Sequence, residues 1–412
     1  MNIIHTSDWH LGNRLLGYSR QEEFRQFLEW LLEQMKERRA DVLLISGDVF
    51  DSANPGDAAR KLYCDFLSRA DETGCKQVIV TAGNHDSALQ LEVTRPLLER
   101  YHCTVVTRLT HDTAASCLIP VTNAAGTEQA LICAVPFLRV GDVALPAAAE
   151  DEEGRRTAYT RGIAQLYAEV GELAAAWKAE HPGCPVIGMG HLAVSGIEKT
   201  ASTHDILGTL STVNADIFPA AFDYTALGHI HRPSAADSRH RYCGSPLAMG
   251  MDEGAYQHNI LFLQTQGADC SVREIPVPPF TQMVQCRCTC EADLHRCVAG
   301  LTEQHTLHHR PVWLEVLYAG GDMSMEAVRT YLAEQLPESD GHKTAAMKDI
   351  TAAVHTSAAA DAAAAETLQH YTPQGLFERR LNEYVAEHPE LDADKQAAVR
   401  ALFLSLLSDI NA

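Results

Sequence analysis

Short apolar runs alternate with amphipathic stretches over the first hundred residues. Residues 2–6, 42–45 and 76–82 have the length and composition of buried strands. The stretch between the first two carries apolar residues at helical spacing: Phe24, Phe27, Leu28, Leu31, Leu32 and Met35. A second helical stretch opens at Pro55 and Gly56. Strand, helix, strand, helix, strand predicts parallel strands joined by right-handed crossovers, and therefore a layered α/β domain.

Beyond Pro96 the pattern becomes irregular, with short β runs near residues 103–106 and 131–135, and it changes again after about residue 275. Apolar runs at 185–190 and 222–227 and two closing strands complete the first domain, 1–275. The PVPPF segment that follows is typical of a linker, because prolines stiffen an extended chain. Beyond it, two strands alternate with two helices, which predicts a small α+β domain over 276–342.

The last seventy residues form two further segments. Residues 343–371 are rich in alanine and low in complexity, which predicts either a helix or a flexible linker. Residues 372–412 hold two amphipathic helical stripes that include Leu376, Phe377, Leu381, Leu402, Phe403 and Leu406. These stripes either pack on the preceding domains or bind a partner protein as helices in a groove. We favour a partner, because the segment has no obvious core of its own.

The charge, the absence of long apolar runs and the cysteine pattern limit the classes of protein to which this chain could belong. A net charge of −21 over 412 residues argues against nonspecific coating of nucleic acid by this chain alone, because such surfaces are basic. Bound divalent cations or a basic partner would offset that charge. We see no signal peptide and no apolar run of about 20 residues, and expect a soluble, cytoplasmic protein away from membranes. The twelve cysteines are expected to be reduced core residues. A zinc site at Cys286, Cys288, Cys290, His295 and Cys297 is disfavoured, because the cysteines alternate without knuckle spacing.

Polar side chains follow the apolar runs at one turn after another. They occur in SDWHLG, GDVFDSANP, GNHD, GMGHL and GHIH, and comprise Asp8, His10, Asp48, Asn84, His85, Asp86, His191, His229 and His231. The carboxyl ends of parallel strands meet at one rim of a sheet, where open α/β folds hold their ligands. One such histidine would usually be structural, whereas a whole set at equivalent turns predicts a metal site.

The spacing suggests how two ions would be held. Asp8 and His10 fall on the same side of an extended segment, since side chains alternate with period two. Asp48 is the natural bridge between ions about 3.5–4 Å apart, and His229 and His231 would divide between them. Oxygen and imidazole ligands without thiolate suit manganese, iron or zinc. Such a pair hydrolyses phosphate esters, and His85 is placed to stabilise the transition state or protonate the leaving oxygen.

These motifs, in this order, resemble the calcineurin-like metallophosphoesterase superfamily. SDWHLG, GDVFD with a proline after it, YCGSP at 242–246 and the added C-terminal segments are similar, more narrowly, to the SbcD family of nuclease subunits. The motifs cover the first 275 residues, and the rest matches only in architecture. The resemblance implies a layered β-sandwich flanked by helices, with a capping domain.

It also implies roles for individual residues. Asp8, His10, Asp48 and His231 would hold one Mn²⁺ ion, and Asp48, Asn84, His191 and His229 the other. His85 would be catalytic, while Asp51 and Asp86 would support the ligands from behind. Asp51 stands where archaeal relatives carry a histidine that assists catalysis, so we assign it no acid chemistry.

The family further implies partners. Its members bind an SbcC-type coiled-coil ATPase through the C-terminal helices, as a homodimer within a heterotetramer. They degrade duplex DNA ends as exonucleases and cut single strands and hairpins as endonucleases in DNA repair, recombination and replication. The alternative from the same fold is a stand-alone phosphodiesterase or phosphomonoesterase. Ser52 counts against the protein phosphatases, which carry an arginine there. A scaffold with a vestigial metal site is the third alternative, and the complete ligand set speaks against it.

Overall fold

The computed structural model describes residues 1–93, 98–127, 129–143, 152–197, 212–308, 311–319, 322–336 and 343–349. Beyond them it describes only Leu381, Arg400 and Phe403. The chain divides into a unit of Met1–Lys348 and a second unit of Asp349–Ala412. Among the described helices, none is both long and apolar enough to cross a membrane.

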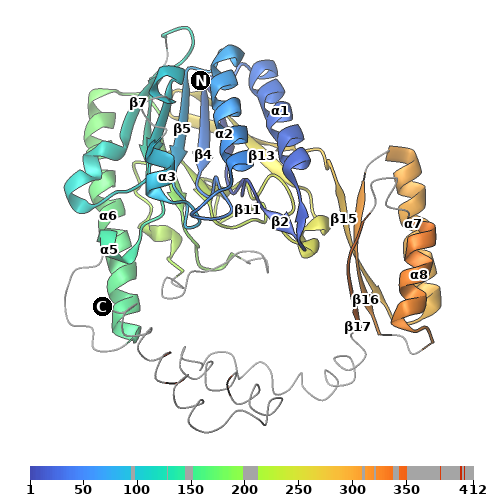
Figure 1. The fold of residues 1–412 in the computed structure, drawn as a ribbon. Coiled ribbons are helices and arrows are strands. Elements are labelled where there is room, and N and C mark those ends of the chain that lie inside the picture. The colour runs from blue at the N-terminus through green and yellow to red at the C-terminus, as the bar shows by residue number, and fades with distance from the viewer. Residues whose placement is uncertain are drawn as a thin grey trace. The chain divides into compact units, whose positions relative to one another are not determined.

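Two six-stranded sheets form the core of the first unit (Figure 1). The first sheet has the order β14 (Asp269–Pro276), β13 (Asn259–Gln266), β1 (Asn2–Thr6), β4 (Val42–Ser46), β5 (Gln77–Thr81) and β6 (Cys103–Val106). The second has the order β11 (Ser234–Ala235), β12 (His240–Tyr242), β10 (Tyr224–Gly228), β9 (Val186–His191), β8 (Gln129–Ala134) and β7 (Leu118–Thr122). Strands β1, β4, β5 and β6 run parallel, as the sequence predicts.

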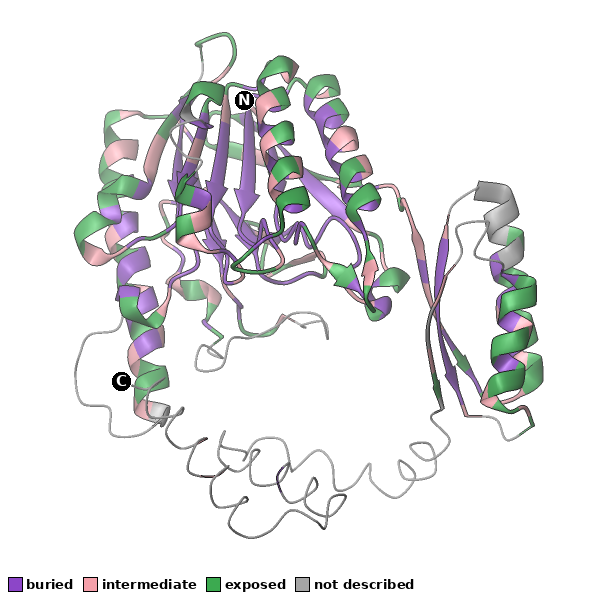
Figure 2. Ribbon diagram, in the orientation of Figure 1, coloured by how far each residue is buried: buried purple, intermediate pink, exposed green. Residues whose placement is uncertain are grey.

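Apolar side chains fill three layers of this core. Ile3 and Leu44 of one sheet share a cluster with Ile187 and Tyr224 of the other, so the two sheets pack face to face. Helices α1 (Gln21–Glu37) and α2 (Asp57–Ala70) cover the outer face of the first sheet, and α6 (Glu152–Glu180) covers that of the second. The central strands of both sheets are accordingly buried, whereas the helices expose their outer faces (Figure 2). This arrangement confirms the layered sandwich predicted from the sequence.

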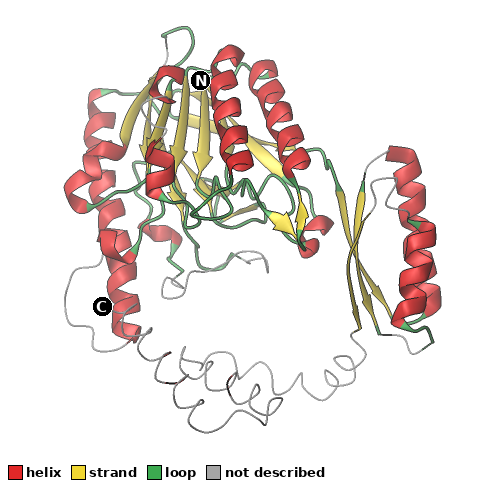
Figure 3. Cartoon of the chain, viewed as in Figure 1, coloured by secondary structure: helices red, strands yellow, loops and turns green. Residues whose placement is uncertain are grey.

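A small α+β domain follows β14. Strands β15 (Gln282–Cys288), β16 (Val312–Tyr318) and β17 (Lys343–Asp349) form a sheet, with α7 (Glu291–His308) and α8 (Met325–Gln335) on one face (Figure 3). Strand β17 occupies the first residues of the segment that we expected to be an alanine-rich linker, so the sheet extends beyond residue 342. Strand β17 lies beside β16 in the sheet, and its Met347 packs against the apolar cluster of this domain. Lys348 Nζ lies 2.7 Å from Glu315 Oε1.

Two sequence expectations on the remaining segments have different outcomes. Cys286 and Cys297 are joined by a disulfide, which corrects the expectation that all cysteines are reduced. The predicted tail residues Leu376, Phe377, Leu402 and Leu406 lie outside the described residues, whereas Leu381 is helical and buried and Phe403 is helical and half-buried. The role of this tail stays a prediction.

Candidate metal centre

The strand ends that carry the predicted ligands lie level with one another. In the first sheet Thr6 pairs with Ile45, and Ser46 pairs with Thr81. In the second sheet Gly228 pairs with His191. The Ser46 hydroxyl donates to the carbonyl of Ala226 at 3.1 Å and links the two sheets at this rim. All five motifs therefore open onto one place, as the sequence predicts.

The backbone that carries the ligands is left-handed at four positions. The φ angles of Asp8, His10, Asp48 and His229 are 53°, 47°, 50° and 92°. The expectation that Asp8 and His10 share one side of an extended segment is therefore wrong. Their loop is fixed instead by hydrogen bonds from Asp8 N to Gly47 O and from His10 N to Asp48 O, both 3.0 Å. Non-glycine residues adopt this conformation at a cost of about 1–3 kcal/mol each, and such residues cluster at functional sites.

Two glycines allow the loops to approach. A Cβ atom on Gly83 would lie 2.1 Å from Asp48 Oδ1, and one on Gly228 would lie 1.9 Å from the carbonyl oxygen of Ser46. Neither position has room for a side chain. The GNHD and GHIH motifs therefore need their first residue to be glycine for packing reasons.

One group of potential ligands consists of Asp8, His10 and His231, whose donor atoms lie within 4.8 Å of one another. The Nε2 atoms of His10 and His231 are 3.1 Å apart. The Nδ1 atom of His231 lies 3.0 Å from Glu253 Oε1, and the Nδ1 atom of His10 lies 3.4 Å from Asp51 Oδ1. A carboxylate behind each ring thus orients both Nε2 atoms toward the same point.

A second group consists of Asn84, His191 and His229. Asn84 Oδ1 lies 2.9 Å from His191 Nε2 and 3.0 Å from His229 Nδ1. The other nitrogen of His191, Nδ1, lies 2.9 Å from the carbonyl of Ser46 and must donate to it. Burial opposes protonation of His191, but the charge of Asp48 outweighs it and raises the pKa of this imidazole to about 9. A bound cation would take the place of the proton on Nε2, because Nδ1 is already committed to the Ser46 carbonyl.

Asp48 lies between the two groups. Its Oδ2 atom is 3.7 Å from His10 Nε2 and 3.3 Å from His191 Nε2. The backbone N–H of His85 donates to its Oδ1 atom at 2.9 Å. Burial opposes ionisation of the Asp48 carboxyl, but the surrounding histidines, above all His191, outweigh it and hold its pKa far below the usual range. The carboxylate is thus ionised and faces both groups.

His85 lies beside the first group. Its Nδ1 atom is 2.9 Å from the carbonyl of Asp51, so this nitrogen donates and the other is left to face the site. One ring nitrogen lies within 4.8 Å of donor atoms from His10 and Asp48. The geometry therefore admits His85 both as a ligand and as a proton donor.

In addition to Asp51, the carboxylates of Asp86 and Glu253 support the centre from behind. Buried Asp86 accepts hydrogen bonds from the N–H groups of Gly83, Val49 and Phe50 at 2.9, 3.1 and 2.9 Å, and so joins two ligand loops. Burial and the nearby Asp48 raise its pKa to about 6. Fully buried Glu253, which orients His231, was not predicted. It lies in a 3₁₀ turn, Met251–Ala255, without any motif or periodicity that marks it.

Comparison with known proteins agrees with this geometry. Residues 1–233 match the family described as Calcineurin-like phosphoesterase. The chain is 32% identical over 422 residues to the D subunit of Nuclease SbcCD from Escherichia coli (strain K12), covering 99% of this chain and 98% of that protein. It is 36% identical over 320 residues to the D subunit of Nuclease SbcCD from Rhodobacter capsulatus, covering 76% of this chain and 77% of that protein. The chain belongs to the calcineurin-like phosphoesterases and, within them, to the SbcD family of nuclease subunits.

Proposed function

We propose that this chain is a two-metal phosphodiesterase that cleaves DNA. The observation that carries the proposal is the position of Asp48, whose Oδ2 atom faces His10 at 3.7 Å on one side and His191 at 3.3 Å on the other. A carboxylate flanked by two sets of ligands is the arrangement that bridges a pair of cations.

The donor atoms suit Mn²⁺ in both positions. We assign Asp8, His10, Asp48 and His231 to one ion, and Asp48, Asn84, His191 and His229 to the other. The imidazoles of His10, His191 and His231 each have Nδ1 engaged by an oxygen and Nε2 directed inward. Carboxylate, amide and imidazole donors without a thiolate favour manganese over copper(I).

The chain's own groups divide the chemistry among them. When bound, the cations would neutralise phosphate charge and make hydroxide available at neutral pH. His85 stabilises the transition state or gives a proton to the leaving oxygen, and the carbonyl of Asp51 holds its ring in place. Asp86 keeps the Asp48 and Asn84 loops together through its three hydrogen bonds.

The substrate and partner follow from the family. We propose duplex-end exonuclease activity and endonuclease activity on single strands and hairpins, in DNA repair, recombination and replication in the cytoplasm. The net charge of −21 disfavours DNA binding by this chain alone, and bound cations together with a partner would offset it. That partner is a coiled-coil ATPase of the SbcC type, bound through residues 372–412, with two copies of this chain in a heterotetramer.

Purified protein with Mn²⁺ tests the proposal. Linear duplex DNA, hairpin DNA, a nucleotide monoester and bis(p-nitrophenyl) phosphate are offered with and without the ATPase partner, beside an Asp48→Asn control. We expect the DNA and the phosphodiester to be cleaved and the control to be inactive. Intact DNA under every condition, beside rapid hydrolysis of the monoester, would favour the stand-alone phosphatase instead.

Removal of the tail tests the partner assignment separately. A chain ending at Thr372 should fold, retain hydrolysis of the small phosphodiester and no longer bind the ATPase partner in size-exclusion chromatography. An insoluble product would support the alternative that the tail packs on the preceding domains. A soluble product that still binds the ATPase would place the contact elsewhere.

A further inference from the structure

Arg20 is a cation whose side chain is completely buried. It precedes α1 and donates from Nε to Glu23 Oε2 at 2.8 Å and from Nη1 to Asn13 Oδ1 at 3.1 Å. Its Nη2 atom has no hydrogen-bond partner among the residues that the structure describes. Burial of an ion pair costs several kcal/mol, and apolar residues often stabilise a core as well. Stability alone is therefore a poor reason for an arginine at this position.

Hydrogen bonds connect Arg20 to the metal centre through Asn13. Asn13 Nδ2 donates to Asp51 Oδ1 at 3.0 Å. The same carboxylate oxygen lies 3.4 Å from His10 Nδ1, and the backbone carbonyl of Asp51 accepts from His85 Nδ1 at 2.9 Å. Asn13 uses both ends of its amide, since Oδ1 accepts from Arg20 while Nδ2 donates to Asp51. The orientation of Asp51 therefore depends on a residue whose own orientation is set by Arg20.

A second contact reaches His231. Arg20 Nη1 lies 3.8 Å from the sulfur of Met249. The backbone N–H of Met249 donates to Glu253 Oε2 at 2.7 Å, and Glu253 holds His231. Arg20 is thus linked to the supports of all three histidines on one side of the centre.

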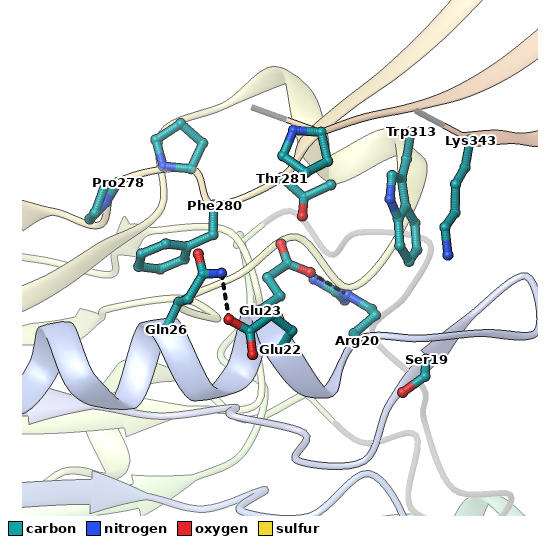
Figure 4. A pocket seen from close by; sticks show the side chains of 12 residues that line it. Ser19, Arg20, Glu22, Glu23, Gln26, Pro278, Phe280, Thr281, Trp313 and Lys343 are labelled. Carbon is teal, nitrogen blue, oxygen red and sulfur yellow. Dashed lines mark hydrogen bonds and ion pairs between the residues drawn. The ribbon is translucent and has the colours of Figure 1, made fainter. Parts of the chain in front are cut away.

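The same arginine lies at the contact with the α+β domain. Between Asn13 and Arg20 the chain forms a hairpin of β2 (Arg14–Leu15) and β3 (Tyr18–Ser19). The ring of Tyr18 packs edge-on against Trp313 at 5.7 Å, and Lys343 Nζ lies 4.4 Å from the Tyr18 ring centre. Arg20 and Glu23 line a pocket of about 450 Å³ together with Trp313 and Lys343 (Figure 4).

We propose that Asn13 and Arg20 are positioning residues of the catalytic centre. They fix the position of Asp51, and through it the positions of His10 and His85, relative to the hairpin that contacts the α+β domain. The inference rests on the proposed function, because it assigns the two residues to phosphodiester hydrolysis. It adds two residues that touch neither substrate nor metal.

Three variants test the inference on the full chain with Mn²⁺ and bis(p-nitrophenyl) phosphate. Asn13→Asp keeps the shape and the acceptor for Arg20 but replaces the donor to Asp51 with a second carboxylate. Arg20→Met removes both donors, and Arg20→Lys restores the charge beside Glu23. Arg25→Met is the control, since it breaks the exposed Arg25–Glu22 pair on the same helix.

We expect Asn13→Asp and Arg20→Met to lower kcat about 10- to 100-fold with KM within twofold. Arg20→Lys should recover part of the loss, and Arg25→Met should match wild type. Wild-type kcat in Asn13→Asp and Arg20→Met would overturn the inference, as would a loss that vanishes when kcat is expressed per folded molecule from circular dichroism. Failure of the wild-type chain to hydrolyse any phosphodiester would instead overturn the proposed function.

Discussion

The Nε2 atoms of His10 and His231 face each other at 3.1 Å, although 221 residues separate them in the chain. The Nδ1 atoms of both rings are already directed at carboxylates, those of Asp51 and Glu253. Without a cation, one of the two Nε2 atoms must carry a proton, whereas with a cation both can donate their lone pairs to it. The pair is therefore built to converge on a positive ion.

Glu253 should tune the metal affinity of this pair. Glu253→Gln keeps the size of the side chain but removes its charge and leaves one oxygen to serve His231, Ser245 and Met249. We expect Mn²⁺ affinity to fall about 10- to 100-fold, measured by calorimetric titration. Glu33→Gln, an exposed position on α1, is the control and should bind like wild type. Unchanged affinity in Glu253→Gln would show that His231 does not depend on this carboxylate.

His85 should act in the reaction and not in metal binding. His85→Gln is expected to retain both ions and to lose about 100- to 10,000-fold in kcat, because it removes a group that acts in the transition state. Metal content by mass spectrometry and hydrolysis of the phosphodiester are measured on the same sample. Loss of an ion from this variant would make His85 a ligand.

Gly83 should tolerate no side chain. In Gly83→Ala the new methyl group would collide with Asp48, so we expect displacement of that carboxylate and loss of metal binding. Overpacking of this kind costs about 1–3 kcal/mol of folding free energy. Gly56→Ala is the control, since nothing lies within 4 Å of its added Cβ. Normal Mn²⁺ binding by Gly83→Ala would contradict the assigned packing.

Stability should fall on acidification because of His5. Burial lowers the pKa of this imidazole from 6.5 to about 3. The unfolded chain therefore binds a proton on His5 at a higher pH than the folded chain does. The folded state is fully stable with respect to this group above pH 6.5, and it is progressively destabilised as the pH falls from 6.5 toward 3. Between these two pKa values, one such histidine lowers the free energy of unfolding by about 1.4 kcal/mol for each unit by which the pH falls. Urea denaturation with EDTA should show that wild type loses about 2 kcal/mol more than His5→Asn between pH 6.5 and 5. Equal losses would contradict this assignment.

Much of the centre could be predicted because it follows from strand order. Asp48 and Asn84 come directly after buried parallel strands, and strand register alone brings such positions to one rim. The same reasoning failed for the path between Asp8 and His10. Their left-handed backbone depends on hydrogen bonds to the neighbouring Asp48 loop, which no local pattern reveals.

The side chains that hold the predicted ligands in place were harder to predict than the ligands themselves. Glu253 reaches His231 from a turn 22 residues later, a contact that depends on tertiary packing. Arg20 reaches Asn13 across the short β2–β3 hairpin, which the sequence analysis did not predict. Strand β17 was missed because its residues, KTAAMKD, show no regular alternation of apolar and polar positions and begin the alanine-rich segment. It joins the sheet beside β16, which lies about 25 residues earlier in the chain.

An anomalous difference map from crystals grown or soaked with Mn²⁺ tests whether Asp48 bridges two cations. We expect two peaks about 3.5–4 Å apart, one on each side of Asp48 and both contacting its carboxylate. A single peak, or two peaks of which either lies away from Asp48, would contradict a bridging role for Asp48.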